Sequence, residues 1–394
     1  MSSSKNYFNP YREDMPEVLS DYNLNDIRHF HASLPGYEQT SLVSLPGLAK
    51  NNGVGALLVK DESSRFGLKS FKVLGAAYGA FKLLQKMWQA EFDTEIPLDQ
   101  LLDKDNISKL GDLTFTAATD GNHGRAIAWT ARILGINAVI YVPDNMVGAR
   151  IEAIKSEGAE VIPVDGTYDE AMARAEQESE KNGYLLIQDS SWEGYQEIPV
   201  WIMQGYQTLF DEAYEQMEKI GIDKPDLVFI QAGVGSFASA AATYHVSRFG
   251  QDRPTMICVE PMEADCLFSS ITSPDGQLTP TQGLQDSIMS GLNCGIPSMI
   301  SWPINRATYD LFQSIDDSWA ELAMKALYQH QQGAVRVIAG ESGAAGLAGL
   351  MAILGEPVLE GVRERLDISS DTTVLIVNTE GDTDPESFRN IVGT

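Results

Sequence analysis

The sequence predicts an α/β protein made of two doubly wound domains with mostly parallel sheets. From Leu113 onward, short apolar strands alternate with amphipathic helices, a pattern that is typical of βαβ units. The later strands are almost continuously apolar, as expected for strands buried on both faces of a parallel sheet. With 394 residues, the chain is long enough to form two or three compact units, each with a hydrophobic core.

The first series of elements lies in the middle of the chain, where Gly135 ends a helix and Pro143 ends a strand. We expect strands at 113–117, 138–142, 160–164 and 184–188, and helices at 122–134, 150–156 and 168–181. These elements are sufficient for one compact doubly wound unit.

A second series follows later in the chain. We expect a helix at about 199–219, and strands at 227–231, 256–259 and 373–377. The amino-terminal region lacks a complete βαβ set of its own, so we expect it to join this later unit. The expected domains are therefore a larger one, residues 1–80 plus 200–394, and a smaller inserted one, residues 81–199.

The composition makes some classes of partner unfavourable. Lys and Arg number 28 against 55 Asp and Glu, a formal net charge of −27. Such a surface repels phosphate backbones and anionic lipids, so we expect neither nucleic acid nor a membrane surface as a partner. The longest apolar stretch, residues 343–354, suits a buried helix, and the amino end lacks the apolar stretch of a secretory signal. We therefore expect a cytoplasmic protein.

The sequence contains three cysteines, Cys258, Cys266 and Cys294, and no Cys-x-x-Cys pair. This pattern indicates buried thiols, not a disulfide framework or a zinc cluster. The histidines show no metal-ligand spacing apart from a weak pair at His29 and His31. We therefore expect no metal site.

The first segment that could carry chemistry surrounds Lys72. Ser70 can cap a helix whose first turn bears Lys72, and small residues follow at 75–77. A lysine on a helix is usually solvated. It becomes a nucleophile where an apolar pocket wall lowers its pKa enough for Schiff-base chemistry.

The second segment, residues 117–124, is a polar loop between a strand and a helix. It lies where open α/β sheets bind ligands, at the carboxyl ends of the strands. Asp120, Asn122 and His123 are crowded on this loop, which favours a ligand site. In the alternative interpretation, Asn122 caps the helix after an ordinary Asp-Gly turn and His123 is satisfied locally.

The third segment, residues 232–239, directly follows a strand and opens a helix with the sequence Ala-Gly-Val-Gly-Ser-Phe-Ala-Ser. Backbone N–H groups and the helix dipole converge there, which predicts a phosphate-binding loop. The segment also matches the loose Gly-x-Gly-x-x-Gly/Ala dinucleotide pattern, with Glu260 near the position of a ribose-binding acid. By itself it does not distinguish NAD from another phosphorylated cofactor.

The fourth segment is the acidic turn at 378–385, which follows the last strand. Its carboxylates could bind a cation, but a solvated or helix-capping loop is the more common use of such a run.

The four segments occur in one order: a lysine helix, an Asp-Gly-Asn-His-Gly loop, a glycine-rich loop and a hydroxyl-bearing turn. In this order they resemble the fold type II (tryptophan synthase β-like) pyridoxal-phosphate enzymes and, within that group, the diaminopropionate ammonia-lyases. The resemblance covers nearly the whole chain and rests on the motifs Arg65–Leu68, Ala118–Arg125, Gln188–Asp189, Trp192–Tyr195, Ile202–Tyr206, Gly340–Ala344 and Thr379–Asp384.

The resemblance implies a pyridoxal 5'-phosphate site in the cleft between the two domains. Lys72 would bond covalently to the cofactor, and Lys69 would be a surface charge. Asn122 would hydrogen-bond the 3-oxygen of the cofactor, and Thr379 would face its pyridine nitrogen. The phosphate would be held by the backbone of Gly233, Val234, Gly235, Ser236 and Phe237.

The implied reaction is α,β-elimination of ammonia from 2,3-diaminopropionate, which gives pyruvate and two molecules of ammonia. Related serine and threonine dehydratases usually lack an acid before the Gly-Asn-His, where this sequence has Asp120. We expect Lys72 to accept the Cα proton of the L-isomer and Asp120 that of the D-isomer. The expected substrate-binding residues are Asp120, Asp189, Thr119 and Ser70, and the two carboxylates would face the extra ammonium.

The resemblance also implies a homodimer. It places Cys266 and Cys294 in loops near the active-site entrance, where the two could approach each other. In a reducing cytosol we expect both to remain thiols.

Several alternatives remain open. A serine or threonine dehydratase, or another lyase for 3-substituted alanines, would use the same cofactor and lysine. An NAD-dependent oxidoreductase would use the 233–238 glycine pattern and Glu260, but it would leave Lys72 and Asp120 without a role. A non-catalytic binding module would need a degenerate cofactor site.

Overall fold

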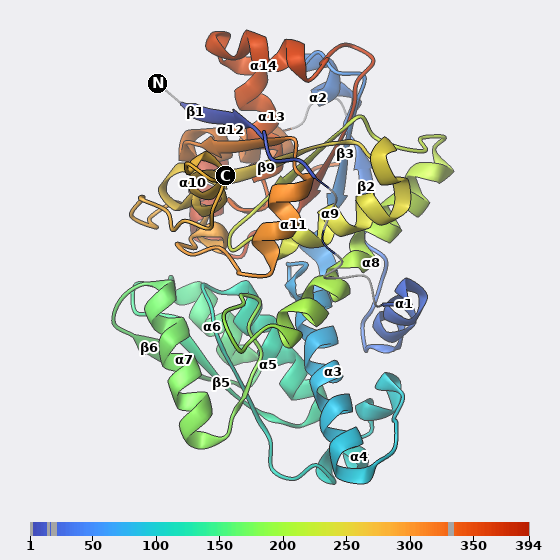
Figure 1. Cartoon of the computed structure of the whole chain (residues 1–394), viewed down its shortest axis with the longest axis vertical. Helices are drawn as coiled ribbons and strands as arrows, with labels where there is room; N and C mark the ends of the chain where they lie inside the picture. Colours follow the sequence, from blue (N-terminus) through green and yellow to red (C-terminus); the bar gives the residue numbers. More distant parts are fainter. Residues whose placement is uncertain (1–2, 14–15, 17–21, 330–334, 394) are drawn as a thin grey trace. The chain divides into compact units, whose positions relative to one another are not determined.

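The computed structural model describes residues 3–13, 16, 22–329 and 335–393. Within these residues the chain divides into two compact units, and each has its own sheet (Figure 1). The first unit consists of Met1–Val18, Gln39–Ser64 and Leu209–Thr394, and the second of Leu19–Glu38 and Arg65–Thr208. The predicted α/β class is confirmed, and the domain boundaries given above stay a prediction.

The sheet of the first unit is built from β1 (Ser4–Phe8), β2 (Ser41–Ser44), β3 (Ala56–Asp61), β8 (Leu227–Gln231), β9 (Thr255–Pro261), β10 (Leu311–Ile315) and β11 (Thr373–Asn378). In the described part of the chain its order is β1-β10-β9-β8-β11-β3-β2. The inner strands are parallel, whereas β1 and β2 pair antiparallel at the two edges. The strands β8, β9 and β11 are those that the sequence predicts.

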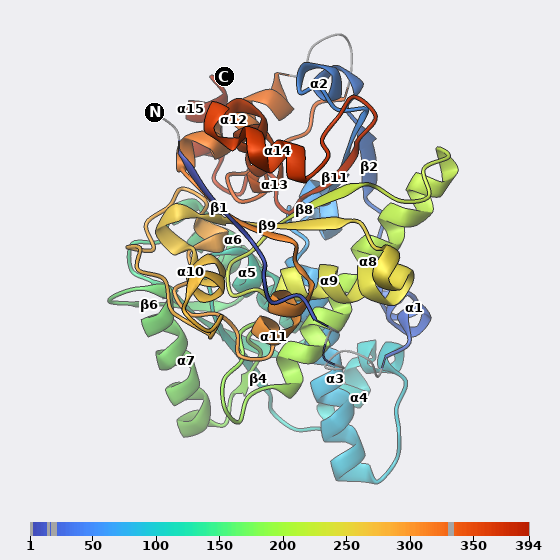
Figure 2. The same ribbon diagram turned by 45° about the horizontal axis from the view of Figure 1, so that its top comes forward.

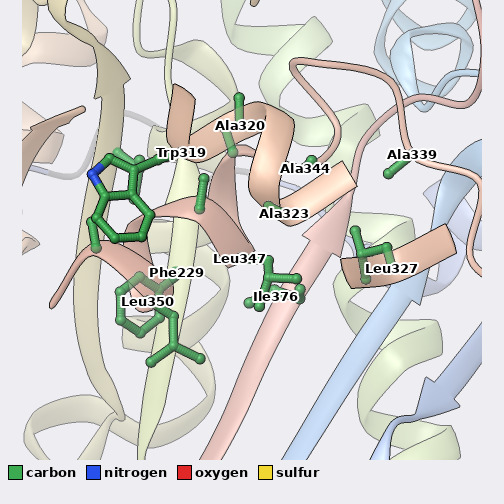
Figure 3. Packing of buried hydrophobic residues seen from close by; sticks show 14 of the residues in the cluster. Phe229, Trp319, Ala320, Ala323, Leu327, Ala339, Ala344, Leu347, Leu350 and Ile376 are labelled. Atoms are coloured by element: carbon green, nitrogen blue, oxygen red, sulfur yellow. The ribbon is translucent and has the colours of Figure 1, made fainter. Parts of the chain in front are cut away.

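Helices cover both faces of this sheet. One face carries α12 (Asp317–Tyr328), α13 (Ala345–Gly355) and α14 (Glu360–Arg365), and the other carries α9 (Ser236–Phe249) and α11 (Ser301–Thr308) (Figure 2). Buried side chains of α12 and α13 form one hydrophobic cluster with Phe229 of β8 and Ile376 of β11 (Figure 3). Among the described residues the unit also contains α2 (Pro46–Asn51), the second part of α8 (Glu197–Lys219), α10 (Cys266–Thr272) and α15 (Pro385–Val392).

The helix α13 lies close to the sheet because glycine and alanine dominate its sequence. A Cβ on Gly349 would lie 2.6 Å from Oε1 of Gln313 and 2.7 Å from Cγ2 of Val259, so a larger residue would push the helix away. Among the described residues, no single helix is long and apolar enough to cross a membrane. In this part of the chain, α13 and Pro357–Arg365 together meet the length and composition of a membrane span, but the pair is bent by 88°.

The sheet of the second unit consists of the parallel strands β4 (Thr114–Ala118), β5 (Asn137–Pro143), β6 (Glu160–Val164) and β7 (Leu185–Leu186), in the order β6-β5-β4-β7. α7 (Tyr168–Asn182) packs on the face that holds Val139 and Tyr141, and α5 (Asn122–Leu134) packs on the opposite face (Figure 1). The other helices are α1 (Leu24–Ser33), α3 (Lys72–Phe92), α4 (Lys104–Ser108), α6 (Gly148–Ser156) and the first part of α8 (Glu197–Lys219).

The strand β7 is shorter than the predicted 184–188. Beyond Ile187, whose N–H still bonds Thr116, the side chain of Gln188 replaces the backbone ladder. Its Oε1 accepts the N–H of Ala118 at 3.1 Å, and its Nε2 donates to the carbonyl of Ala118 at 3.2 Å. The predicted helix at 122–134 is confirmed without a change of bounds.

Two glycines let α3 and the first part of α8 approach closely. A Cβ on Gly75 would lie 2.5 Å from the ring of Tyr206, and a Cβ on Gly205 would lie 2.6 Å from the carbonyl of Leu74. This approach fixes the start of α3, where Lys72 lies, against Tyr206.

A buried ion pair joins β3 to α8 within the first unit. Lys60 and Glu212 are both inaccessible to solvent, and Nζ of Lys60 lies 2.7 Å from Oε2 of Glu212. The ammonium also donates to the carbonyl of Thr40 at 2.8 Å and to Oε1 of Gln216 at 3.2 Å. All three of its protons are therefore used, as a buried cation requires.

Replacing Glu212 by Ala leaves the Lys60 ammonium buried without a counter-charge. We expect the variant to lose about 3–5 kcal/mol of folding free energy, which is seen as a lower midpoint of thermal unfolding. Glu218→Ala is the matched control, because Glu218 lies on the same helix and pairs with Arg248 at the surface. That change should cost about 1 kcal/mol or less, and equal midpoints for the two variants would contradict this account.

Candidate active site

Lys72 is the first residue of α3, in the second unit. Its N–H lies 3.4 Å from the hydroxyl of Ser70, which is buried. The predicted cap is therefore shifted by one residue. Phe71 occupies the N-cap position, and Ser70, one residue before it, accepts the N–H of Lys72. Lys69, expected at the surface, lies half-buried in the preceding turn.

The side chain of Lys72 forms an ion pair with Asp189. Nζ lies 2.5 Å from Oδ2, and the two side chains are 20% and 6% exposed. Burial by itself lowers the pKa of Lys72, but Asp189, with further contributions from Tyr206 and Asp120, outweighs burial and raises the pKa. The structure therefore surrounds the Lys72 ammonium with a carboxylate partner and not with a purely apolar wall.

Asp189 follows β7 at the carboxyl end of the sheet. Gln188 directly before it is fixed by Ala118 and by Tyr195, whose hydroxyl accepts the Gln188 N–H at 2.8 Å. Burial raises the pKa of Asp189, but the nearby Lys72 and His123 outweigh it, so the carboxyl stays ionised. The structure thus holds a charged carboxylate against the lysine.

The polar loop after β4 is held by Thr119. Its hydroxyl oxygen accepts the N–H groups of Gly121 at 2.9 Å and Gly124 at 3.0 Å. Asn122 is the first residue of α5 and not its cap, since Gly121 occupies the N-cap position and no side chain caps the helix. The alternative interpretation of Asn122 as a helix cap is therefore wrong.

Asp120 lies half-buried on the same loop. Its carbonyl oxygen accepts a hydrogen bond from Nη1 of Arg150 at 3.3 Å, and its negative charge contributes to the raised pKa of Lys72. In the second unit Lys72 therefore lies against Asp189 and under the electrostatic influence of Asp120, and the roles of these residues stay predictions.

Tyr206 of α8 contributes to the electrostatic environment of Lys72, although it is not among the predicted site residues. Its ring lies 4.7 Å from that of Phe71, between centroids, and burial raises the pKa of its hydroxyl. Its sequence signal is that it ends the motif Ile202–Tyr206.

The glycine-rich loop lies in the first unit, between β8 and α9. Gly235 is the N-cap of α9 with a φ of 97°, and no side chain caps the helix. A Cβ on Gly235 would lie 2.7 Å from Nδ2 of Asn305, so both conformation and space require glycine there. The first-turn N–H groups of this 14-residue helix lack a side-chain cap, which suits a phosphate.

Neighbouring segments fix this loop. The carbonyl of Val234 accepts the N–H of Ser298 at 2.8 Å, the hydroxyl of Ser236 lies 3.2 Å from that of Ser301, and Asn305 donates to the carbonyl of Gly235 at 3.0 Å. A phosphate-binding loop of this kind is preorganised, because its backbone dipoles do not have to turn when the anion binds.

Thr379 lies directly after β11 and is buried. Its hydroxyl oxygen lies 3.0 Å from Nε2 of Gln231, which also donates to the carbonyls of Val377 and Ser342, both at 3.0 Å. Gln231 was not predicted as a site residue. Its signal is a polar side chain at the end of an otherwise apolar strand.

Glu260 does not face a ligand. It is completely buried, and its two oxygens accept the N–H groups of Leu267 at 2.8 Å and Phe268 at 2.7 Å in the first turn of α10. Burial raises the pKa of Glu260 well above its usual range. The dinucleotide alternative therefore loses its ribose-binding acid.

The acidic turn caps a helix, which is the common use expected for it. Asp384 accepts the N–H groups of Glu386 and Ser387 at the start of α15. No group of His, Cys, Asp and Glu that could hold a metal occurs among the described residues.

All three cysteines are buried thiols in the structure. Cys266 donates to the carbonyl of Gly233 at 3.5 Å, and a Cβ on Gly233 would lie 3.0 Å from Sγ of Cys294. Both thiols therefore border the glycine-rich loop.

Comparisons with known proteins agree with this geometry. A family model described as "Pyridoxal-phosphate dependent enzyme" matches residues 34–379. The curated diaminopropionate ammonia-lyase of Escherichia coli (strain K12) is 42% identical over 365 residues, which cover 93% of this chain and 90% of that protein. The chain belongs to the diaminopropionate ammonia-lyase family.

Solved structures of the E. coli diaminopropionate ammonia-lyase share this fold. The complex with an aminoacrylate-PLP azomethine reaction intermediate gives a TM-score of 0.91 at 38% identity and covers 100% of this chain and 97% of that chain. The complex with D-serine gives a TM-score of 0.90 at 38% identity and covers 99% and 97%.

The cofactor of this diaminopropionate ammonia-lyase family member is pyridoxal 5'-phosphate. Two observations fit it: the uncapped helix N-terminus behind Gly235 suits the phosphate, and the half-buried Lys72 supplies the amine. The predicted residues of the second unit are Lys72, Ser70, Thr119, Asp120, Asn122 and Asp189, and those of the first unit are Gly233, Val234, Gly235, Ser236, Phe237 and Thr379.

Replacing Gly235 by Ala should weaken the binding of pyridoxal phosphate by about ten-fold or more, because the added methyl group collides with Asn305 and displaces the phosphate-binding N–H groups. Titration followed by the absorbance of the bound cofactor measures this. Gly250→Ala is the matched control: Gly250 ends the same helix with a φ of 57°, and nothing lies within 4 Å of its added Cβ. Equal weakening in both variants would contradict the assignment of the loop.

Proposed function

We propose that this chain catalyses pyridoxal-phosphate-dependent α,β-elimination of ammonia from D- and L-2,3-diaminopropionate, giving pyruvate and two molecules of ammonia. The observation that carries the proposal is the pairing of Lys72 with Asp189 beside Asp120. Two carboxylates around the reactive lysine suit a substrate with two ammonium groups, whereas a β-hydroxy substrate has only one.

The named relatives support the same reaction. The E. coli relative is a diaminopropionate ammonia-lyase, and its structures hold an aminoacrylate-PLP azomethine reaction intermediate in one case and D-serine in the other. An aminoacrylate group is what remains of a 3-substituted alanine after elimination, and D-serine is an amino acid of the D-series.

The cofactor contacts are proposed residue by residue from the resemblance to the family. Lys72 bonds to pyridoxal phosphate and Asn122 contacts its 3-oxygen, while the backbone of residues 233–237 holds the phosphate. Pyridoxal phosphate, when bound, supplies an electron sink for negative charge at Cα. Because the Thr379 hydroxyl accepts from Gln231, its own proton is left for the pyridine nitrogen.

The side chains of the second unit are proposed to handle protons and charge. Lys72 accepts the Cα proton of the L-isomer, and Asp120 accepts that of the D-isomer. Asp189 binds the extra ammonium of the substrate. The hydroxyls of Ser70 and Thr119 already accept backbone N–H groups, so each has its own proton left to donate to the substrate carboxylate.

The product assay separates this proposal from its neighbours. Purified protein is incubated with D- and L-2,3-diaminopropionate, L-serine and L-threonine, and keto acid and ammonia are measured together. We expect pyruvate from both diamine isomers, with twice as much ammonia as pyruvate. Keto acid from L-serine or L-threonine, with none from the diamine, would make the protein a dehydratase.

Replacing Asp120 by Asn tests the assignment of the two bases. We expect kcat/KM for the D-isomer to fall about 100-fold or more, because a general base typically contributes about that much, while the L-isomer loses much less. Asp189→Asn is the comparison variant, because loss of the ammonium-binding carboxylate should impair both isomers. Equal losses on both isomers in Asp120→Asn would contradict the two-base assignment.

We also propose a cytoplasmic homodimer, with the domain boundaries predicted above. The homodimer follows from the resemblance to the family, whereas the location and the domain boundaries follow from the sequence pattern. Light scattering after size-exclusion chromatography should give about twice the chain mass of 43.1 kDa.

A further inference from the structure

His123 is a buried base that the proposed reaction leaves without a role. It lies on the first turn of α5, and its side chain is 3% exposed. Its Nε2 lies 2.7 Å from the carbonyl oxygen of Ile187. Since a carbonyl only accepts, Nε2 carries the proton, and the neutral ring presents a lone pair at Nδ1.

The lone pair at Nδ1 faces Asp189. Nδ1 lies 3.9 Å from Oδ2 of Asp189, and it has no hydrogen-bond partner in the part of the chain that the structure describes. A carboxylate oxygen also only accepts, so these two atoms cannot bond until a proton lies between them. The ring is thus held in the tautomer and position that can receive one.

The same carboxylate oxygen bonds the ammonium of Lys72. Oδ2 of Asp189 lies 2.5 Å from Nζ of Lys72, so one atom faces both the lysine and the histidine. Lys72 has to lose a proton before its nitrogen can form a covalent bond or accept a proton from Cα. Its pairing with Asp189 opposes that loss, so the site needs an internal proton acceptor.

We propose that His123 is this acceptor: a proton moves from Nζ of Lys72 through Oδ2 of Asp189 to Nδ1 of His123. The products are a neutral amine and an imidazolium that bonds the carboxylate. The summed charge of the three groups stays at zero, so no charge is created in the buried site. His123 acts through Asp189 and is therefore a positioning residue.

The Lys72 ammonium opposes a positive charge on His123, and this opposition ends when the transferred proton leaves Lys72. Burial and the Lys72 ammonium lower the pKa of His123, while Asp189 raises it. Asp120 and Tyr206 act on Lys72. Arg125, on the same helix as His123, is paired with Glu157 at 3.2 Å.

Nitrogen NMR of the histidine rings tests the proposal directly. In protein labelled with ¹⁵N-histidine, two-bond ¹H–¹⁵N correlations report the tautomer and charge of each ring, and His123→Gln identifies the His123 signals. In Lys72→Met, which removes the competing ammonium, we expect the His123 ring to be an imidazolium at pH 7. In the double variant Lys72→Met, Asp189→Asn it should return to the neutral Nε2–H form.

The same spectra contain their own control. His245 is also buried, but it lies in the first unit, where its Nδ1 bonds the carbonyl of Ala241 and burial lowers its pKa to about 4. Its signals should stay neutral in every variant. Lys72→Ala replaces Lys72→Met if the latter does not fold.

A kinetic readout separates proton transfer from a structural role. Glutamine at position 123 can still donate an N–H to Ile187 but cannot accept a proton. We expect His123→Gln to slow the bonding of pyridoxal phosphate to cofactor-stripped protein by about ten-fold or more at pH 7. The rate should then rise about ten-fold per pH unit, because solvent must deprotonate Lys72.

Either of two results would overturn the proposal: a neutral His123 ring in Lys72→Met, or a cofactor-bonding rate that His123→Gln leaves unchanged. The inference rests on the proposed function only in taking Lys72 as the cofactor-bonding lysine. Neither measurement uses diaminopropionate, so a failure of the substrate assignment is distinguishable from a failure of this one.

Discussion

The half-buried ammonium of Lys72 and the buried carboxylate of Asp189 stabilise each other, and the rest of the candidate site in the second unit depends on this pair. The charge of the buried Asp189 is favoured by its partner, because burial by itself raises the pKa of a carboxyl. The close approach of α3 and α8 places the lysine, and the side-chain clamp of Gln188 on Ala118 places the carboxylate. The ion pair keeps Lys72 protonated and in position, and it therefore also opposes deprotonation of the lysine. Accepting this proton is the role proposed for His123, the base beside the carboxylate.

In the first unit, opposite charge also stabilises a charged group, but there the group is an anion and the protein supplies backbone dipoles. Its glycine-rich loop presents backbone N–H groups at the start of α9, and Asn305 and Ser298 hold the loop in place. Backbone N–H dipoles bind a phosphate without a positively charged side chain, which suits a chain with a net charge of −27. A phosphate-binding loop and a reactive lysine are both expected of a pyridoxal-phosphate enzyme, the family to which this chain belongs.

Local sequence patterns predict much of the fold. The features that they do not predict depend on contacts between residues far apart in the chain. The helix at 122–134 and the strand at 227–231 follow from periodicity, glycine and proline within a few residues. The edge strands β1 and β2 are short, and β1 has its partner far along the chain, so their sequences carry little signal. The sign of the pKa shift of Lys72 depends on Asp189, 117 residues away. Roles for Gln231 and Tyr206 likewise require the folded chain.

The identity of the cofactor-bonding lysine is the claim on which the rest depends. Borohydride reduction fixes the cofactor to its lysine, and mass spectrometry of the digested protein then locates it. We expect a single modified residue, Lys72, and no modification of Lys69 three positions earlier. Modification of Lys69, of the buried Lys60 or of any other lysine would contradict the account of this active site.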